Sequence, residues 1–374
     1  MNAPVIFEEM ACLNGKKIGL ATLNAPNKLN ALGLPMIELL IPQLESWQAN
    51  PDIAIVILQG AGDKAFCAGG DIVNLYGEMV ENPGQYSDNV QAFFTQEYQL
   101  DYLIHTLNKP VMVWGSGIVM GGGLGLMVGA SHRVVTESTR MAMPEIAIGL
   151  YPDVGATWFL SHMPEKLGLF LGLTGAQLNA ADAKYLELGN YFIRDEHQVN
   201  LFDALLSVGW GDTIALNHEK LATLLHEFEL HSNFKMPESK IRQHGQLLND
   251  LMAHEDPTDI VKAIKSLPSD CEWLLRAKQS LTSGSPLSAA LVFRQLQQGK
   301  DLCLADCFRL ELNLSLRAAQ YGEFAEGVRA LLVDKDKKPK WKNLEIEDIE
   351  PEVIDWFFKP VFTIEEHPLK SLGF

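Results

Sequence analysis

The stretch KAFCAGGD, residues Lys64 to Asp71, decides the fold together with a second glycine turn, Gly121-Gly122-Gly123. The first stretch follows IAIVIL (Ile53–Leu58), a continuous β-branched run typical of a strand buried on both faces. Glycine lets the backbone approach a ligand closely, and a glycine turn at a helix N-terminus presents unpaired N–H groups. Two such turns at the ends of neighbouring strands can direct two amides, one from each turn, at the same oxygen as an oxyanion hole.

Outward from these turns, strands and helices alternate in the first half of the chain. Pro42 should kink or split the helix that contains it. Beyond about Gly175 the pattern turns mostly helical. We therefore expect an α/β core over residues 1–200 and a mainly helical C-terminal region over residues 201–374. The expected strands are Lys17–Leu23, Ile53–Leu58, Val111–Trp114 and His132–Thr136, and the expected helices are Met36–Trp47, Asn89–Leu107, Pro286–Gln298 and Ala305–Tyr321.

Composition excludes several classes of function. The chain has 374 residues, of which 47% are hydrophobic, and a net charge of -17, which argues against nucleic acid or an anionic membrane as a partner. Five cysteines without a C-x-x-C pair indicate packed thiols and no metal site. Together with the absence of a secretory signal in Met1–Met10, they lead us to expect a cytoplasmic protein. The uncharged run Val111–Ala130 contains seven glycines, so we expect it to be core and not a membrane span.

Two nucleotide-binding motifs are excluded by spacing. Gly121, Gly123 and Gly125 do not form G-x-G-x-x-G, and no G-K-[ST] occurs in the chain. Either glycine turn alone is more often a close-packing feature than a ligand site.

The order of the motifs resembles that of the crotonase (enoyl-CoA hydratase/isomerase) superfamily. The motifs AFCAGGD, KPV, MGGGLGL and MPExxIGLYPDVG occur in succession between Ala65 and Gly155. Late in the chain, EGVRA (Glu326–Ala330) followed by DKD and PKW is similar to the 3-hydroxyisobutyryl-CoA hydrolase branch. The resemblance runs from about residue 15 to 345 and implies a crotonase-like spiral of β-β-α units with a helical C-terminal region.

The resemblance also implies roles for particular residues. Gly70 and Gly122 match the two amide donors to a thioester oxygen, Glu145 matches a catalytic carboxylate, and Asp153 matches the acid that marks the hydrolase branch. Substrate binding then involves Glu97, Gly122, Glu145 and Asp153. Glu97 also lies at the centre of an apolar helical stripe, where a carboxylate is unfavourable unless paired or functional. The alternatives are that Glu97 reaches solvent, that Glu145 is a surface acid, and that Asp153 only forms a turn.

The acids favour one reaction over another. In the hydratase branch the helix after the triple glycine carries a second Glu, but this chain has Gly125 there, so hydration by paired acids is disfavoured. Hydrolysis of a 3-hydroxyacyl-CoA, with 3-hydroxyisobutyryl-CoA of valine catabolism as the implied substrate, fits Glu145 and Asp153 better. The alternatives are enoyl-CoA hydratase/isomerase activity and a non-catalytic acyl-CoA-binding interaction protein.

The expected partner is an acyl-CoA substrate, with no metal and no cofactor beyond the coenzyme A of the substrate. Homo-oligomerisation stays open. Candidate phosphate ligands are basic residues, although lysine runs are usually solvated surface. They are Lys28, Lys64, Lys335, Lys337, Lys338 and Lys340.

Overall fold

The computed structural model describes residues 3–373. The chain forms two compact units, each assembled from three stretches of sequence, and each is described by itself. Unit 1 comprises residues 1–70, 103–141 and 178–243, and unit 2 comprises residues 71–102, 142–177 and 244–374. The predicted division into residues 1–200 and 201–374 describes the order of strands and helices along the sequence. It stays a prediction, because each compact unit combines stretches from both sides of residue 200.

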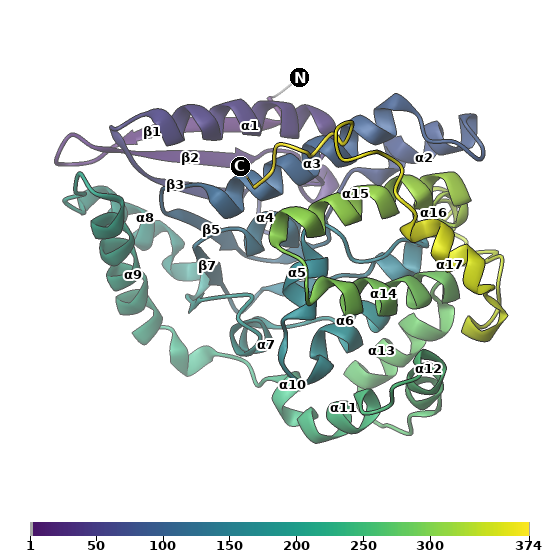
Figure 1. Cartoon of the computed structure of the whole chain (residues 1–374). Helices are drawn as coiled ribbons and strands as arrows, with labels where there is room; N and C mark the ends of the chain where they lie inside the picture. The colour runs from purple at the N-terminus through teal and green to yellow at the C-terminus, as the bar shows by residue number, and fades with distance from the viewer. Residues whose placement is uncertain (1–2, 374) are drawn as a thin grey trace. The chain divides into compact units, whose positions relative to one another are not determined.

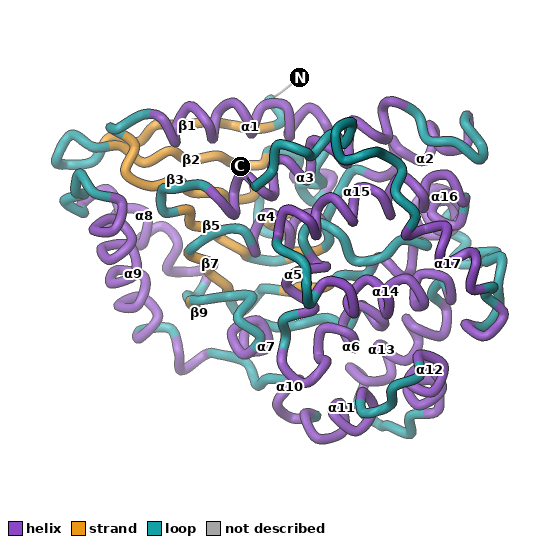
Figure 2. The backbone as a smooth tube through the Cα atoms, in the orientation of Figure 1, coloured by secondary structure: helices purple, strands orange, loops and turns teal. Residues whose placement is uncertain are grey.

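A six-stranded sheet forms the centre of unit 1, with strand order β1-β2-β3-β5-β7-β9. β1 pairs antiparallel with β2, and every later neighbour pair in this sheet is parallel. The strands are drawn in orange in Figure 2. Their bounds are Val5–Ala11, Lys17–Leu23, Ile53–Gly60, Val111–Gly115, His132–Val135 and Tyr191–Phe192. Parallel neighbours require crossover connections, as the alternation of strands and helices predicts.

A second, three-stranded sheet has the order β4-β6-β8, with bounds Ala65–Cys67, Ile118–Met120 and Arg140–Ala142. β6 was not predicted from the sequence. It lies between the expected strand Val111–Trp114 and the triple glycine, where Gly117 (φ +64°) turns the chain between β5 and β6. This short strand places the triple glycine beside the KAFCAGGD turn.

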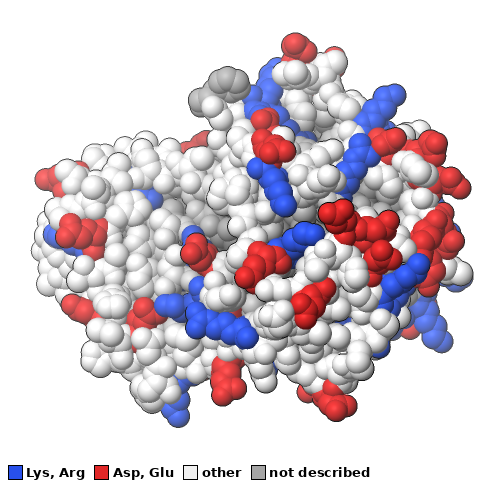
Figure 3. Space-filling model, turned by 60° about the horizontal axis from the view of Figure 1, so that its bottom comes forward, with Lys and Arg blue, Asp and Glu red and all other residues white. Residues whose placement is uncertain are grey.

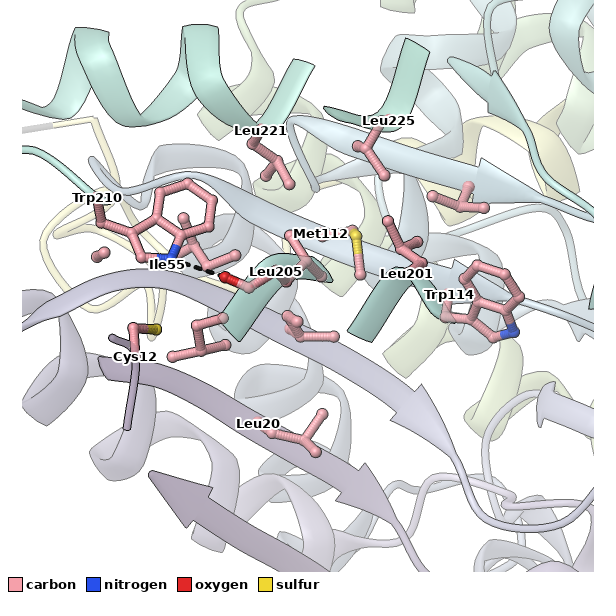
Figure 4. Close-up of a cluster of buried hydrophobic side chains, with 14 of the residues drawn as sticks. Cys12, Leu20, Ile55, Met112, Trp114, Leu201, Leu205, Trp210, Leu221 and Leu225 are labelled. Atoms are coloured by element: carbon pink, nitrogen blue, oxygen red, sulfur yellow. Dashed lines mark hydrogen bonds between the residues drawn. The ribbon is translucent and has the colours of Figure 1, made fainter. Parts of the chain in front are cut away.

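Helices cover both faces of the six-stranded sheet. On one face α1 (Leu34–Ala49) packs its Trp47 against Gly19 of β2, where an added Cβ would lie 2.6 Å from the indole ring. On the other face α8 (Gln198–Ser207) and α9 (Ile214–Leu230) bury Leu205 and Leu221 against the strands, as Figure 4 shows. The Trp210 indole N–H in this cluster donates to the Leu205 carbonyl at 3.2 Å. Burial on both faces explains why β3 is apolar without a break from Ile53 to Leu58.

The other helices of unit 1 are short. They are η1 (Pro26–Lys28), α4 (Gly122–Val128), α7 (Ala180–Tyr185), η4 (Asp195–His197), η5 (Asn233–Lys235) and α10 (Lys240–Gln243).

Unit 2 is built from helices, and its α-helices are labelled in Figure 1. Four of them carry or support the acidic residues discussed below: α3 (Asp88–Thr106, which continues into unit 1), η2 (Glu145–Ile148), α5 (Ala156–Ser161) and α15 (Leu304–Tyr321). The remaining ones are α2 (Ile72–Glu81), η3 (Pro164–Lys166), α6 (Leu167–Thr174), α11 (Gly245–Met252), α12 (Pro257–Ser266), α13 (Glu272–Ser283), α14 (Pro286–Gly299), α16 (Glu323–Val328), η6 (Arg329–Val333), η7 (Ile346–Asp348) and α17 (Pro351–Phe358).

The predicted α/β core with a helical C-terminal region is confirmed. The predicted strand Lys17–Leu23 has the same bounds in the structure, and the other expected strands and helices differ by a few residues at their ends. Pro42 does not split α1, which runs as one helix through it. Within residues 3–373, no helix combines the length and the apolar character that crossing a bilayer requires.

Candidate active site

The two glycine turns lie side by side in unit 1. β4 and β6 run parallel, with Cys67 opposite Val119. Gly70 lies three residues beyond Cys67, and Gly122 lies three residues beyond Val119. Because parallel strands end at the same edge of a sheet, both glycines leave the small sheet at one edge.

Close backbone contacts fix the distance between the two turns. Gly69 has φ +110°, and a Cβ added there would lie 3.4 Å from the Met120 carbonyl oxygen and 3.9 Å from the Gly122 nitrogen. A Cβ on Gly123 would lie 2.2 Å from the Cys67 carbonyl oxygen, which no side chain tolerates. Glycine is therefore required here so that α4 can approach β4.

Neither of the two predicted amide donors is used by the surrounding secondary structure. Gly122 is the first residue of α4, a position whose N–H has no acceptor within its helix. The loop before Gly70 is held by other groups, since the Leu32 amide donates to the Gly69 carbonyl at 2.8 Å. Within residues 3–373 the Gly70 amide donates to no backbone carbonyl. Both amides thus remain candidate donors to a developing oxyanion, and this role stays a prediction.

The three predicted acids belong to unit 2 and are all buried. Glu97 on α3 is 3% exposed, and Glu145 and Asp153 are each 5% exposed. Glu145 begins η2 directly after Pro144, and Asp153 lies in the loop before α5. The alternatives of a solvent-reaching Glu97 and a surface Glu145 are therefore wrong. Asp153 does lie in a turn, since Val154 and Gly155 both have positive φ, but its carboxyl group is buried.

Burial and mutual repulsion disfavour ionisation of these acids. Burial raises the pKa of Glu97, and the charges of Asp153 and Glu145 raise it further. Burial, then the charge of Asp153, raises the pKa of Glu145. Burial raises the pKa of Asp153 to about 6. Glu145 Oε2 is buried and has no hydrogen-bond partner in the described part of the chain. The cluster therefore favours a mixture of charged and neutral acids, which is the arrangement used for acid–base and nucleophilic work.

Sequence reasoning missed the groups that hold Asp153. The Tyr98 hydroxyl lies 2.7 Å from Asp153 Oδ2. Glu311 of α15 accepts from the Gly155 and Thr157 amides, each at 2.8 Å, and so fixes the loop that carries Asp153. Burial raises the pKa of Glu311 to about 8. Tyr98 follows Glu97 directly, which is a weak local signal, but the role of Glu311 depends on packing between segments more than 150 residues apart.

A further buried acid on α3 was also missed. Asp101 lies one helical turn after Glu97 and is 0% exposed. Neither of its carboxylate oxygens has a hydrogen-bond partner within the described residues. Burial, then the charge of Glu97, raises its pKa well above the usual range. The spacing of Glu97 and Asp101 on one helix face was a signal available in the sequence.

With this geometry in view, comparison with known proteins identifies the family. The family model described as enoyl-CoA hydratase/isomerase matches residues 18–358. The chain belongs to this family. The match confirms the resemblance drawn from the glycine turns and the M-P-E motif, and it covers residues of both compact units.

This member of the enoyl-CoA hydratase/isomerase family is similar to curated hydrolases. It is 35% identical over 347 residues to a protein of Gallus gallus named 3-hydroxyisobutyryl-CoA hydrolase, mitochondrial, covering 92% of this chain and 86% of the relative. A Xenopus laevis protein of the same name is 37% identical, with 91% and 86% covered. Among solved structures, an enoyl-CoA hydratase from Rhodobacter sphaeroides is 29% identical, with a TM-score of 0.80 over 95% of this chain and 97% of that one. The crotonase-like fold is thereby confirmed.

The expected cytoplasmic location is wrong. The curated relatives are named as mitochondrial enzymes, which points away from the cytoplasm. The expectation relied on the cysteine pattern and on the composition of Met1–Met10, neither of which distinguishes the cytoplasm from another reducing compartment.

The candidate phosphate ligands remain unassigned. Lys64 and the lysines between Lys335 and Lys340 are exposed. On the face of the molecule in Figure 3, basic and acidic side chains are interspersed. A net charge of -17 therefore does not prevent local contact with phosphates, because surface charges are screened beyond about 8–10 Å at physiological salt.

Proposed function

We propose that this chain hydrolyses a 3-hydroxyacyl-CoA thioester, with 3-hydroxyisobutyryl-CoA as the best candidate, to the free hydroxy acid and coenzyme A. The observation that carries the proposal is the buried acid pair Glu145 and Asp153, with Glu145 Oε2 left without a partner among the described residues. The names of the curated relatives support the choice of substrate. Such a reaction would serve valine catabolism.

The proposed chemistry begins at the thioester carbonyl. The Gly70 and Gly122 amides stabilise the negative charge that builds up on the carbonyl oxygen. Glu145 either attacks the carbonyl carbon, forming a mixed anhydride and releasing the thiolate, or removes a proton from an attacking water. In the first route water then cleaves the anhydride and regenerates Glu145.

Asp153 confers specificity in this proposal. It accepts a hydrogen bond from the 3-hydroxyl group of the acyl chain and supplies a proton to the departing thiolate. A buried acid that pairs with a substrate hydroxyl discriminates strongly against acyl groups that lack it, because the acid is then left unpaired. Glu97, buried beside the other two acids, is proposed to contact the substrate as well.

Substitution of Glu145 tests the proposal. Glu145→Gln should lower thiol release from 3-hydroxyisobutyryl-CoA by at least about 10³-fold, while acyl-CoA binding measured by calorimetry changes little. Thiol release at the wild-type rate would exclude a catalytic role for Glu145. Single turnover in ¹⁸O-labelled water separates the two routes, since label enters the Glu145 carboxyl group only by way of the anhydride.

A second candidate function is enoyl-CoA hydration, which the likeness to a solved enoyl-CoA hydratase favours. Against it, Gly125 has no side chain where the hydratase branch has its second Glu. Thiol release and loss of enoyl absorbance, measured on the same preparation, distinguish the two activities. Acyl-CoA binding without either activity would instead indicate an interaction protein.

A further inference from the structure

An unbroken chain of four short oxygen contacts runs through the interior of unit 2. Asp153 Oδ2 lies 2.7 Å from the Tyr98 hydroxyl, which lies 2.7 Å from Ser315 Oγ. Ser315 Oγ lies 2.7 Å from the Tyr151 hydroxyl, and that hydroxyl lies 2.5 Å from the Glu311 carbonyl oxygen. Tyr98, Tyr151 and Ser315 are each 0% exposed. Solvent therefore cannot supply hydrogens to the chain from its middle.

The number of hydrogens available for these four contacts decides whether Asp153 is protonated or ionised. Each contact needs one hydrogen between its two oxygens, and a hydroxyl group has one to donate. The carbonyl at the end of the chain can only accept. An ionised Asp153 can also only accept. The hydroxyl groups of Tyr98, Ser315 and Tyr151 then supply three hydrogens for four contacts, so in one contact two buried oxygens face each other without a hydrogen between them. If Asp153 carries a proton on Oδ2, four hydrogens serve four contacts, all donated in the same direction.

We propose that Asp153 rests as the neutral acid, with its proton on Oδ2 donated to Tyr98, and that Tyr98, Ser315 and Tyr151 are positioning residues that hold it in that state. The role of this proton in catalysis rests on the proposed function, whereas the protonation state itself is inferred from the oxygen contacts. A neutral Asp153 leaves Glu145 as the carboxyl group that ionises, since the charge of Asp153 otherwise raises the pKa of Glu145. It also keeps a proton at the acid that serves the leaving group.

The groups around Asp153 also favour its protonated form. Burial already raises the pKa of Asp153 to about 6, and a hydrogen bond donated by Tyr98 to the carboxylate opposes that rise. In the one-directional chain Asp153 is the donor at this contact, so the hydrogen bond favours the neutral form and raises the pKa further. The titratable groups that interact with Asp153 are acids and phenols, namely Glu97, Tyr98 and Asp101 of α3, Glu145 of η2, Tyr151, and Glu311 of α15.

Two substitutions at residues that do not contact Asp153 test this count of hydrogens. In Tyr151→Phe the contacts that remain are Asp153 to Tyr98 and Tyr98 to Ser315, and two hydroxyl hydrogens satisfy both with Asp153 ionised. In Ser315→Ala, Tyr98 is likewise free to donate to the carboxylate. Both variants should therefore lower the pKa of Asp153 by about one unit or more. Tyr76→Phe, a half-buried tyrosine on α2 outside the chain of contacts, is the matched control and should cause no shift.

Infrared difference spectroscopy reads the proton without requiring turnover. The band of a protonated carboxyl group that Asp153→Asn removes should be present at neutral pH in the wild type and should titrate at lower pH in Tyr151→Phe and Ser315→Ala. The high-pH limb of kcat/KM for thioester hydrolysis should move in parallel. A missing band, or one that titrates alike in all variants, overturns the inference. A band that behaves as described in a protein that releases no thiol upholds the inference and refutes the proposed function instead.

Discussion

Gly123→Ala probes the glycine turns most directly. The new Cβ would lie 2.2 Å from the Cys67 carbonyl oxygen, whereas real Cβ contacts under 3.0 Å are essentially never seen. The obstacle is backbone, so no change of rotamer relieves it, and α4 must move by roughly 1 Å away from β4. The amide of Gly122 belongs to the first turn of α4 and must move with it.

The expected loss follows from that displacement. A misplacement of roughly 1 Å typically lowers catalysis by about 10²-fold, and loss of one oxyanion donor lowers it by about 10²–10³-fold. We therefore expect kcat and kcat/KM for thiol release to fall together by about 10²-fold or more, because the interaction is made mainly in the transition state. Overpacking should also lower the free energy of unfolding by about 1–3 kcal/mol.

Steady-state thiol-release kinetics and urea unfolding measure both effects. Gly77→Ala is the matched control: an added Cβ meets nothing within 4 Å in the middle of α2, so activity should be unchanged and stability should rise by about 0.5–1 kcal/mol. A folded Gly123→Ala variant with kcat/KM within about threefold of wild type would refute the assignment of the Gly122 amide.

Two further predictions concern stability. Burial raises the pKa of Glu311 to about 8, so between pH 4.5 and 8 the folded protein holds a proton on Glu311 that the unfolded chain has released. The free energy of unfolding of the wild type, relative to that of Glu311→Gln, should therefore fall by up to about 1.4 kcal/mol per pH unit in this range. Urea unfolding from pH 5 to 8 measures this difference, and a difference that is flat or rises with pH would contradict the prediction. Leu221→Ala, at a fully buried position of α9, should lower the free energy of unfolding by about 2–5 kcal/mol, whereas Leu230→Ala, at the 60% exposed end of the same helix, should change it by less than about 0.5 kcal/mol.

Local patterns in the sequence were sufficient for four of the strands, for four of the longer helices, and for the first set of site residues. The β-branched run Ile53–Leu58 and the glycine turns around Gly70 and Gly122 predicted strands and turns that the structure contains, because strand and turn preferences act over a few residues. The burial of Glu97 followed from its place on an apolar helical stripe. A resemblance in motif order added Glu145 and Asp153, which isolated residue chemistry could not have singled out.

Tertiary structure alone decided how Asp153 is held. Tyr98 and Ser315 are 217 positions apart, and no periodicity links them. Their contact exists because α3 and α15 are both elements of unit 2, which draws residues from three separate stretches of the chain. Hydrogen bonds are short-ranged and directional, so a proton count like that of the Asp153 chain depends on which oxygens packing brings within about 3 Å. The sequence therefore supplied the acids, and packing decided which hydroxyl groups surround Asp153.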